Sequence, residues 1–219
     1  MTATEPTWGM RMSDYSYGYS TDGQDLYCYD GTAILRNIFE IMVAQLLETV
    51  ERDITGYNLM ELERKPIKGN YDLDHLQAIH RAIFEDIYIW AGEIRAGDFL
   101  AKGESVFCKG QYIASCAQEI HRKLVADNFL RLLSKEQLIA KLAYYMGEIN
   151  ALHPFREGNG RTQREFFRSL AFDAGYILFL GDTDPQELLE ADVSAFGGHY
   201  APLEEILSRS LSTKETEDS

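Results

Sequence analysis

A dense cluster of residues suited to binding phosphate lies in the second half of the chain. Gly158 and Gly160 flank Asn159 immediately before a helical pattern. Backbone N–H groups in such a turn can form a concave nest at a helix N-terminus, which binds phosphate oxygens. Arg161 and Arg164 follow on one helical face, so both guanidinium groups can converge on the same anion. The spacing therefore predicts a phosphate site at this turn.

Two further side chains would turn this phosphate site into a reaction centre. Glu157 precedes the nest, where bound phosphate would repel a carboxylate unless a divalent cation stood between them. One carboxylate plus phosphate oxygens is a usual arrangement around Mg²⁺. His153 ends the preceding helical pattern and is separated from the nest by a short loop. It is therefore close enough to act as a base toward a group that attacks the phosphate.

Each of these features is ordinary by itself, because a loop histidine, a Gly-Asn-Gly turn and an Arg-x-x-Arg helix face are common in structural roles. Their combination is unusual. A base, an acid, a nest and two cations occur within the twelve residues HPFREGNGRTQR, which begin at His153. The joint pattern favours a catalytic phosphate site. Phe155 is the exception, since an aromatic residue in mid-loop is expected to anchor that loop in the core.

The rest of the chain predicts a mostly helical domain around this turn. Asp72 or Asp74 is placed to cap one helix, and Ser134 with Gln137 has the capping-box spacing for another. One or two short helices are expected after Pro185. Apolar residues at spacings of three and four predict the longer helices, which cover residues 34–53, 73–88, 113–130, 134–152 and 160–174.

A different pattern occupies residues 93–110, where glycines separate short apolar runs. This pattern is typical of a β-hairpin. No repeat or linker divides the chain, so a single domain is expected. We expect a weakly ordered N-terminal arm at residues 1–26, the domain at 27–208 and a polar C-terminal tail at 209–219.

Composition and charge limit the classes of partner. The 219 residues are 45% hydrophobic and 26% charged, as in an ordinary globular protein. Twenty-one Lys and Arg against 35 Asp and Glu give a net charge of −14. The mean field repels nucleic-acid phosphates and anionic membranes, so we expect no direct nucleic-acid partner and no membrane partner. Three cysteines without a CxxC pair favour a reducing compartment.

The run that begins at His153 matches, at every defining position, the motif HxFx(D/E)GNGRxxR of the Fic domain family. The resemblance extends to IYIWAGEIR at residues 87–95, which looks like the segment before the family's hairpin flap. It also includes FGGHYAPL at residues 196–203, which looks like the family's C-terminal segment. The resemblance covers about residues 27–208 and implies a mostly α fold, a Fic-type helical bundle with one β-hairpin flap.

The resemblance also implies an activity. Family members of this kind are protein adenylyltransferases, which move AMP from ATP to a Ser, Thr or Tyr hydroxyl of a target protein and release pyrophosphate. By position, His153 is the base that deprotonates the hydroxyl, and Glu157 holds Mg²⁺ between the α- and β-phosphates. The hairpin at about residues 94–108 is the flap along which the target protein binds by strand addition.

The other motif positions are assigned to the nucleotide by the same resemblance. Gly158, Asn159 and Gly160 form the anion hole, Arg161 contacts phosphate, and Arg164 orients the γ-phosphate. These roles agree with the demands of phosphoryl-type transfer, which are positioning and charge neutralisation.

Regulation in this family uses an inhibitory helix with the motif (S/T)xxxE(G/N), whose glutamate pairs with the distal arginine. The chain lacks this motif, because the two stretches with similar spacing, at residues 183–188 and 213–218, fail at the last position. The chain therefore resembles members whose inhibitor is a separate small antitoxin, in the bacterial cytoplasm. A host-directed effector, injected into a host cell, is the other expected role.

Two other functions are alternatives. The first is a Fic-fold transferase of another phosphate-containing group, but the phosphotransferase branch replaces GNGR with a Lys-containing sequence, which Gly160 and Arg161 argue against. The second is a catalytically idle nucleotide-binding or interaction module, and the intact His153 and Arg164 argue against it.

Overall fold

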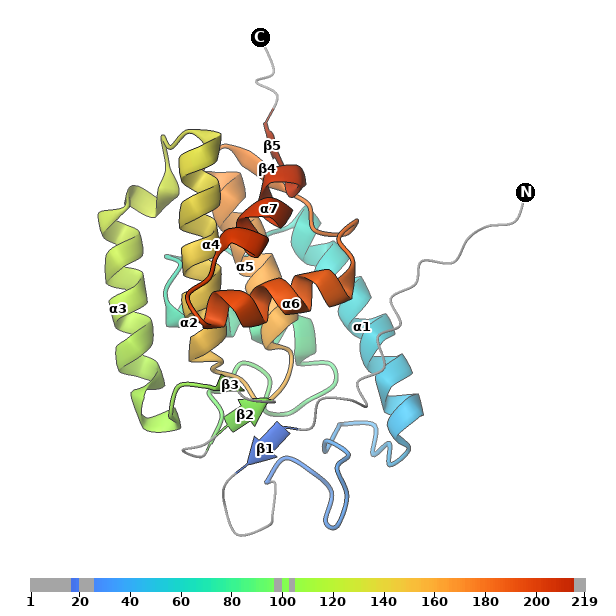
Figure 1. Cartoon of the computed structure of the whole chain (residues 1–219). Helices are drawn as coiled ribbons and strands as arrows, with labels where there is room; N and C mark the ends of the chain where they lie inside the picture. Colours follow the sequence, from blue (N-terminus) through green and yellow to red (C-terminus); the bar gives the residue numbers. More distant parts are fainter. Residues whose placement is uncertain (1–16, 20–25, 97–99, 103–104, 215–219) are drawn as a thin grey trace, which may run out of the picture.

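The computed structural model describes residues 17–19, 26–96, 100–102 and 105–214. Within these residues the chain forms a bundle of helices with short strands at its two ends (Figure 1). None of the helices in this part of the chain is long and apolar enough to span a membrane. The helices are α1 (Ala44–Arg64), α2 (Leu73–Phe84), α3 (Ile113–Ala126), α4 (Lys135–Leu152), α5 (Asn159–Asp173), α6 (Pro185–Phe196) and α7 (Ala201–Ser210). Short 3₁₀ turns occur at Gly110–Tyr112 and Asn128–Leu130.

The predicted helix starts are confirmed where a capping side chain marks them. Asp72 accepts a hydrogen bond of 2.9 Å from the backbone N–H of His75 at the start of α2. Ser134 and Gln137 form a complete capping box at the start of α4, in which each side chain accepts from the other residue's backbone N–H. Such caps satisfy helix donors that otherwise have no partner.

The helix predicted over residues 34–53 is wrong at both ends, because α1 begins at Ala44 and continues to Arg64. Asn37 explains the late start. Its side-chain amide donates to the carbonyl oxygens of Leu35 and Ile41, and its Oδ1 accepts from the Ile41 N–H. Side-chain bonds of this kind offer the backbone an alternative to a helix.

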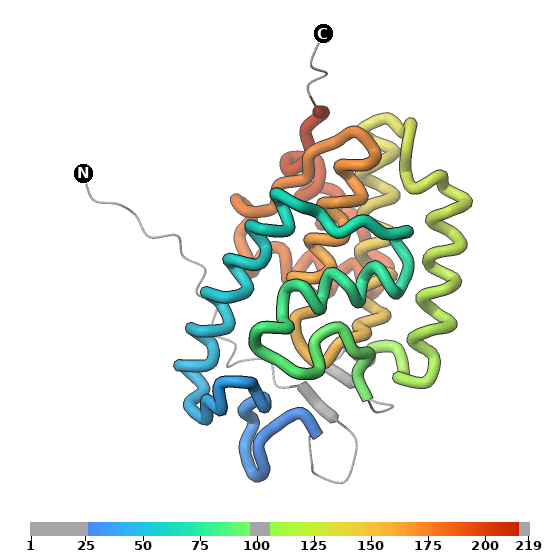
Figure 2. The backbone as a smooth tube through the Cα atoms, turned by 180° about the vertical axis from the view of Figure 1, so that it is seen from behind, coloured from blue at the N-terminus to red at the C-terminus, as the bar shows by residue number. Residues whose placement is uncertain are grey.

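The bundle is organised around α4 and α5. Helix α4 contacts α3, α5, α6 and α7, while α2 packs on α5. Figure 2 shows the reverse side of the molecule, where α2 lies over α5 and α1 packs beside α2. Tyr145 and Met146 of α4 and Phe166 and Phe167 of α5 are each almost fully buried. The loop between these two central helices carries the predicted site, so both of its ends are anchored in the core.

The predicted hairpin is confirmed as the antiparallel pair β2 (Leu100–Lys102) and β3 (Ser105–Val106). A third strand, β1 (Tyr17–Tyr19), pairs with the other edge of β2 in antiparallel register. This strand lies inside the stretch expected to be a weakly ordered arm. Residues 1–16, 20–25, 97–99 and 103–104, which include most of the arm and parts of the flap, lie outside the described residues.

A second strand pair closes the opposite end of the bundle (Figure 1). Strand β4 (Tyr176–Leu178) follows α5 and pairs antiparallel with β5 (Leu211–Thr213). Leu211 is buried in the core, and the Lys214 N–H donates to the Gly175 carbonyl. The polar tail predicted from residue 209 therefore overlaps a packed strand.

Candidate active site

His153 lies immediately after the last residue of α4, and its backbone is held in the left-handed region at φ 44°. Its backbone N–H closes the helix on the carbonyl of Ile149. Its imidazole Nδ1 is 3.3 Å from the carbonyl oxygen of Asn150. A carbonyl can only accept, so Nδ1 carries the proton and Nε2 has the lone pair. The tautomer is therefore the one in which Nε2 can act as a base.

The backbone turn before α5 has the geometry expected of an anion nest. Gly158 has a φ of +78°, and a Cβ at this position would overlap the Phe84 ring. The position thus requires glycine for two reasons, a left-handed backbone and the close approach of a buried aromatic ring. Within the described residues, the N–H groups of Gly160 and Arg161 have no hydrogen-bond acceptor. These donors at the start of α5 are available to an anion.

The Asn159 side chain has a structural role in this turn. Its Oδ1 accepts from the Phe155 N–H at 3.0 Å, and its Nδ2 donates to the Phe155 carbonyl at 2.8 Å. Both polar groups of the amide are therefore occupied by the loop, and only the backbone of Asn159 faces the nest. Phe155 is fully buried, as the sequence predicts, and stacks on the His80 ring at 3.9 Å.

Arg161 is held by α1 rather than left open to solvent. Its Nη2 is 2.6 Å from Oε1 of Glu51, and its Nη1 donates to the Thr55 hydroxyl at 3.2 Å. The guanidinium also lies over the Phe84 ring, 4.7 Å from its centre. Burial would lower the Arg161 pKa, but the charges of Glu51 and Glu157 raise it overall. Arg161 is a fixed cation next to the nest.

Arg164 faces a different element. A Cβ at Gly160 would lie 3.1 Å from Nη1 of Arg164, so the guanidinium adjoins the nest. Within the described residues, Arg164 forms no hydrogen bond or ion pair. Burial lowers its pKa, and Asp192 of α6 opposes this effect from a longer distance. The two arginines therefore do not share a partner in this structure, and Arg164 is the one that still lacks a close anion.

Glu157 lies between the nest and Arg161. Its Oε1 accepts from the Gly158 N–H at 2.9 Å and is 3.8 Å from Nη2 of Arg161. Within the described residues, no group of three or more acidic, histidine or cysteine side chains could hold a metal ion. The donor set is one carboxylate beside a phosphate nest, which fits Mg²⁺ because this ion binds through one or two carboxylates together with substrate phosphates.

His80 supports the site from α2. Its Nδ1 accepts from the Gly92 N–H at 2.8 Å, so its Nε2 carries the proton and donates to the Glu157 carbonyl at 3.0 Å. The ring is fully buried. Burial lowers the pKa of His80 to about 4, despite the opposing effect of the Glu157 carbonyl. This neutral histidine connects the helix before the flap to the loop that carries the acidic residue.

We expect His80 to make folding stability depend on pH. Its pKa is lowered from 6.5 to about 4 on folding, so below pH 6.5 the unfolded chain binds more protons than the folded one. The stabilisation is complete above pH 6.5 and is lost as the pH falls toward 4, with a loss of about 2 kcal/mol by about pH 5. Urea unfolding of the wild type and of His80→Gln at about pH 7 and about pH 5 measures this loss of stability. The variant should lose less stability on acidification, and equal losses would contradict the assignment.

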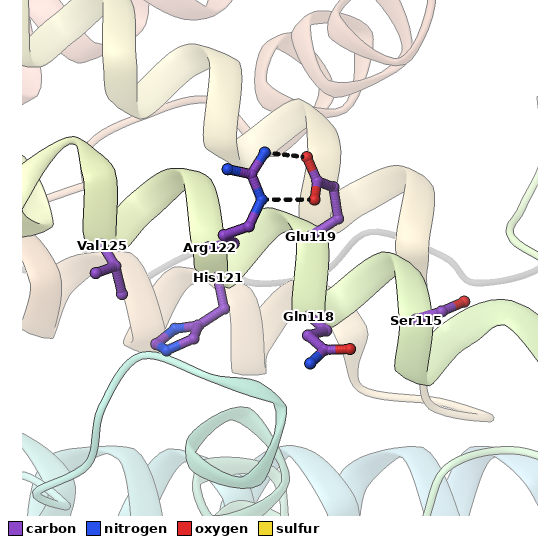
Figure 3. A pocket seen from close by; sticks show the side chains of 6 residues that line it. All are labelled: Ser115, Gln118, Glu119, His121, Arg122 and Val125. Carbon is purple, nitrogen blue, oxygen red and sulfur yellow. Dashed lines mark hydrogen bonds and ion pairs between the residues drawn. The ribbon is translucent and has the colours of Figure 1, made fainter.

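A shallow hollow on the outer face of α3 is separate from this site. It is lined by Ser115, Gln118, Glu119, His121, Arg122 and Val125 (Figure 3). Arg122 and Glu119 pair with each other through two hydrogen bonds, which leaves no charged group free for a ligand. The hollow contains none of the motif residues.

Comparison with known proteins agrees with the geometry of the site. Residues 70–171 match the model of the Fic/DOC family. The chain is 38% identical over 192 residues to the probable protein adenylyltransferase y4lH of Sinorhizobium fredii, with 86% of this chain and 96% of the relative covered. The chain belongs to the Fic/DOC family. It has the helical bundle and hairpin that the sequence predicts for this family, with β1 as an additional strand.

Two further relatives extend this comparison. The protein adenylyltransferase VbhT of Bartonella schoenbuchensis is 38% identical over 187 residues, which cover 85% of this chain. The matched region of this chain spans only 39% of the length of VbhT. The structure of BepC from Bartonella tribocorum, with bound AMPPNP, has a TM-score of 0.80 at 24% identity and covers 86% of this chain and 97% of BepC. This likeness shows that the two proteins share a fold.

Sequence reasoning missed two residues that shape the site. Glu51 lies within the helix predicted over residues 34–53 and was assigned no role, although it lies four residues from both Leu47 and Thr55 on the buried face of α1. An acidic residue at a core position of an amphipathic pattern is the signal that could have identified it. His80 lies on the buried face of α2, but only the tertiary structure shows that it contacts the Glu157 carbonyl.

Proposed function

We propose that this Fic protein is an adenylyltransferase that moves AMP from ATP to a Ser, Thr or Tyr hydroxyl of a target protein. The observation that carries the proposal is one loop, between α4 and α5, that places a base-competent histidine beside unoccupied N–H donors and two partly buried arginines. The relatives named protein adenylyltransferase support the same activity.

The reaction requires one bond to form and one to break. The target hydroxyl oxygen attacks the α-phosphorus of ATP, the bond from that phosphorus to the bridging oxygen breaks, and pyrophosphate leaves. Nε2 of His153 takes the hydroxyl proton, since Nδ1 is already protonated toward Asn150. At the nest formed by Gly158, Asn159 and Gly160, the backbone N–H groups without an acceptor among the described residues, those of Gly160 and Arg161, stabilise charge on the phosphate oxygens.

Positive charge at the site is divided between two places. Arg161, fixed by Glu51, lies beside Glu157 at the nest, where it contacts phosphate. Arg164 has no close anion among the described residues and binds the γ-phosphate. Glu157 would hold Mg²⁺ when the nucleotide is bound, and the ion would supply neutralisation of phosphate charge.

Mass spectrometry of a reaction mixture tests the proposal. The purified chain is incubated with Mg²⁺, ATP and a bacterial lysate, and tryptic peptides are searched for an added AMP. We expect AMP on hydroxyl side chains only when ATP is present. Transfer of a different phosphate-containing group, or nucleotide binding without any modified peptide, would instead support the two alternative functions.

The flap is proposed to align the target by strand addition. In the three-stranded sheet, β2 lies between β1 and β3, so both of its edges are paired. A target strand therefore adds to the outer edge of β3 or displaces β1. Proline in the middle strand removes a backbone donor and distorts both edges. We therefore expect Ala101→Pro to reduce transfer to a protein target by about tenfold or more, with ATP affinity unchanged.

Lys135→Pro is the matched control for the flap variant. Lys135 is the first residue of α4 and follows Ser134, whose ψ of 162° suits a following proline. This control should leave transfer unchanged. Transfer is measured with labelled ATP and affinity by calorimetry. If Ala101→Pro transfers AMP to protein as fast as the wild type, the flap does not bind the target.

Regulation by a separate antitoxin is also part of the proposal. The partner carries (S/T)xxxE(G/N), and its glutamate pairs with Arg164, which excludes the γ-phosphate. We expect the isolated chain to be active and toxic when overproduced, and the partner to silence it. Replacing the partner's glutamate with glycine should restore transfer within the complex. Activation by removal of residues 205–219 from an inactive chain would instead place the inhibitor in cis.

The biological role follows from which protein is modified. A bacterial target would make this chain the toxin of a toxin–antitoxin pair in the cytoplasm, whereas a host target would make it an effector that is injected into a host cell. Labelled ATP added separately to bacterial and host lysates distinguishes these roles by the labelled band.

A further inference from the structure

Arg95 lies in the segment between α2 and the flap and is only 4% exposed. Its side chain bonds to two segments that are distant in sequence. Nε donates to the His153 carbonyl at 2.9 Å, and Nη2 donates to the Cys108 carbonyl just after β3. Its backbone N–H donates to the Pro154 carbonyl at 2.8 Å. Arg95 therefore joins the loop that carries the predicted base to the end of the flap.

The place of the His153 imidazole depends on both of these segments. Its backbone is in the left-handed region, which is unfavourable for a residue with a Cβ and needs support from its surroundings. Its ring stacks on Phe107, with 3.7 Å between ring centres and planes 15° apart. Phe107 immediately precedes Cys108, whose N–H donates to the Ala151 carbonyl in the last turn of α4.

The Arg95 guanidinium thus fixes the backbone of His153 and also the backbone of Cys108, next to the Phe107 ring on which His153 stacks. Arginine suits this task because its planar group carries five N–H donors in a fixed fork, and charged donors make stronger bonds than neutral ones. Lysine has a single compact ammonium group and cannot reproduce the fork. A residue that only filled space would not need both carbonyl contacts.

We propose that Arg95 is a positioning residue, which holds the His153 imidazole against Phe107 in the orientation that proton transfer requires. The expected effect of Arg95 on the reaction rate rests on the proposed adenylyl transfer. The Arg95 contacts and the His153–Phe107 stack can be measured without ATP. Arg95 also couples the flap to the base. Displacement of the segment after β3 would move Phe107 together with the Cys108 carbonyl that accepts from Arg95.

The first experiment measures the ring geometry without any reaction. Ring protons of His153 lie over Phe107 and should have ring-current-shifted NMR signals, which His153→Ala identifies among the five histidines. In Arg95→Gln and Arg95→Lys these signals should move toward those of an unstacked histidine. The matched control is Arg168→Gln, which removes another partly buried arginine, one that pairs with Glu165 and contacts neither segment. It should leave the signals in place.

The second experiment measures catalysis. Arg95→Lys should lower kcat for AMP transfer by about 10²-fold, with KM for ATP unchanged, because a small misplacement of the base affects the chemical step and not nucleotide binding. Phe107→Leu should cause a similar loss of kcat, and the double variant should lose little more than either single one.

The outcomes separate the two proposals. Wild-type protein without AMP transfer would refute the proposed function, while the NMR comparison would still test Arg95. Unshifted His153 signals in a folded Arg95 variant would overturn the positioning role. If both Arg95 variants fail to fold, Phe107→Leu decides, since an unchanged kcat in that variant would show that the stack does not position the base.

Discussion

Replacing His153 with alanine is expected to lower kcat for AMP transfer by about 10³-fold. The imidazole is the group that takes the proton of the target hydroxyl, and its Nδ1 proton is already directed to the Asn150 carbonyl. The nest donors belong to the backbone of α5, so they remain when the ring is removed. Affinity for Mg²⁺–ATP should therefore stay within about twofold of the wild type.

The control for this prediction is His121→Ala. His121 lies on α3 beside the hollow shown in Figure 3, away from the motif loop. It should change neither kcat nor affinity. Calorimetric titration with ATP and a radiolabel assay of transfer are run on all three proteins. An equal loss of nucleotide affinity and rate in His153→Ala would mean that the histidine holds the nucleotide rather than acting as the base.

Arg164→Ala is expected to weaken ATP binding by about 10- to 100-fold, because a charged hydrogen bond to an anion contributes about 1.5–3 kcal/mol. Binding of AMP should change little, since AMP lacks the γ-phosphate. The reason lies in the surroundings of Arg164, which is partly buried beside the nest and is attracted by Asp192 without forming a close ion pair. Burial raises the pKa of Asp192 to about 6, although Arg164 opposes the rise. A phosphate would supply the missing close anion.

The matched control is Arg168→Ala, one helical turn further along α5. Arg168 pairs with Glu165 at 2.7 Å and therefore already has its anion. Its loss should reduce stability without changing the affinity for ATP. Calorimetry with ATP, ADP and AMP compares the variants. If Arg164→Ala weakens AMP as much as ATP, the arginine supports the whole nucleotide pocket and the γ-phosphate assignment fails.

Local patterns explain why much of the fold could be predicted. The caps at Asp72 and Ser134 act within three residues, and the glycine turn before α5 is specified by its own backbone requirements. The start of α1 was mispredicted because the Asn37 side chain bonds to the backbone of Ile41 and stops an apolar pattern from becoming helical. That competition depends on a side-chain conformation, which apolar spacing does not reveal.

The residues of the candidate site and their proposed chemistry could be predicted from the sequence alone, since the predicted base, acid, nest and arginines lie within twelve consecutive residues. The contacts that hold these groups in place became visible only in the folded chain. Glu51 reaches Arg161 from α1, His80 reaches the Glu157 carbonyl from α2, and Arg95 reaches the His153 carbonyl from the base of the flap. These contacts join segments that are 58 to 110 residues apart. Such partners are selected by the packing of whole helices, so no local pattern in the sequence specifies them.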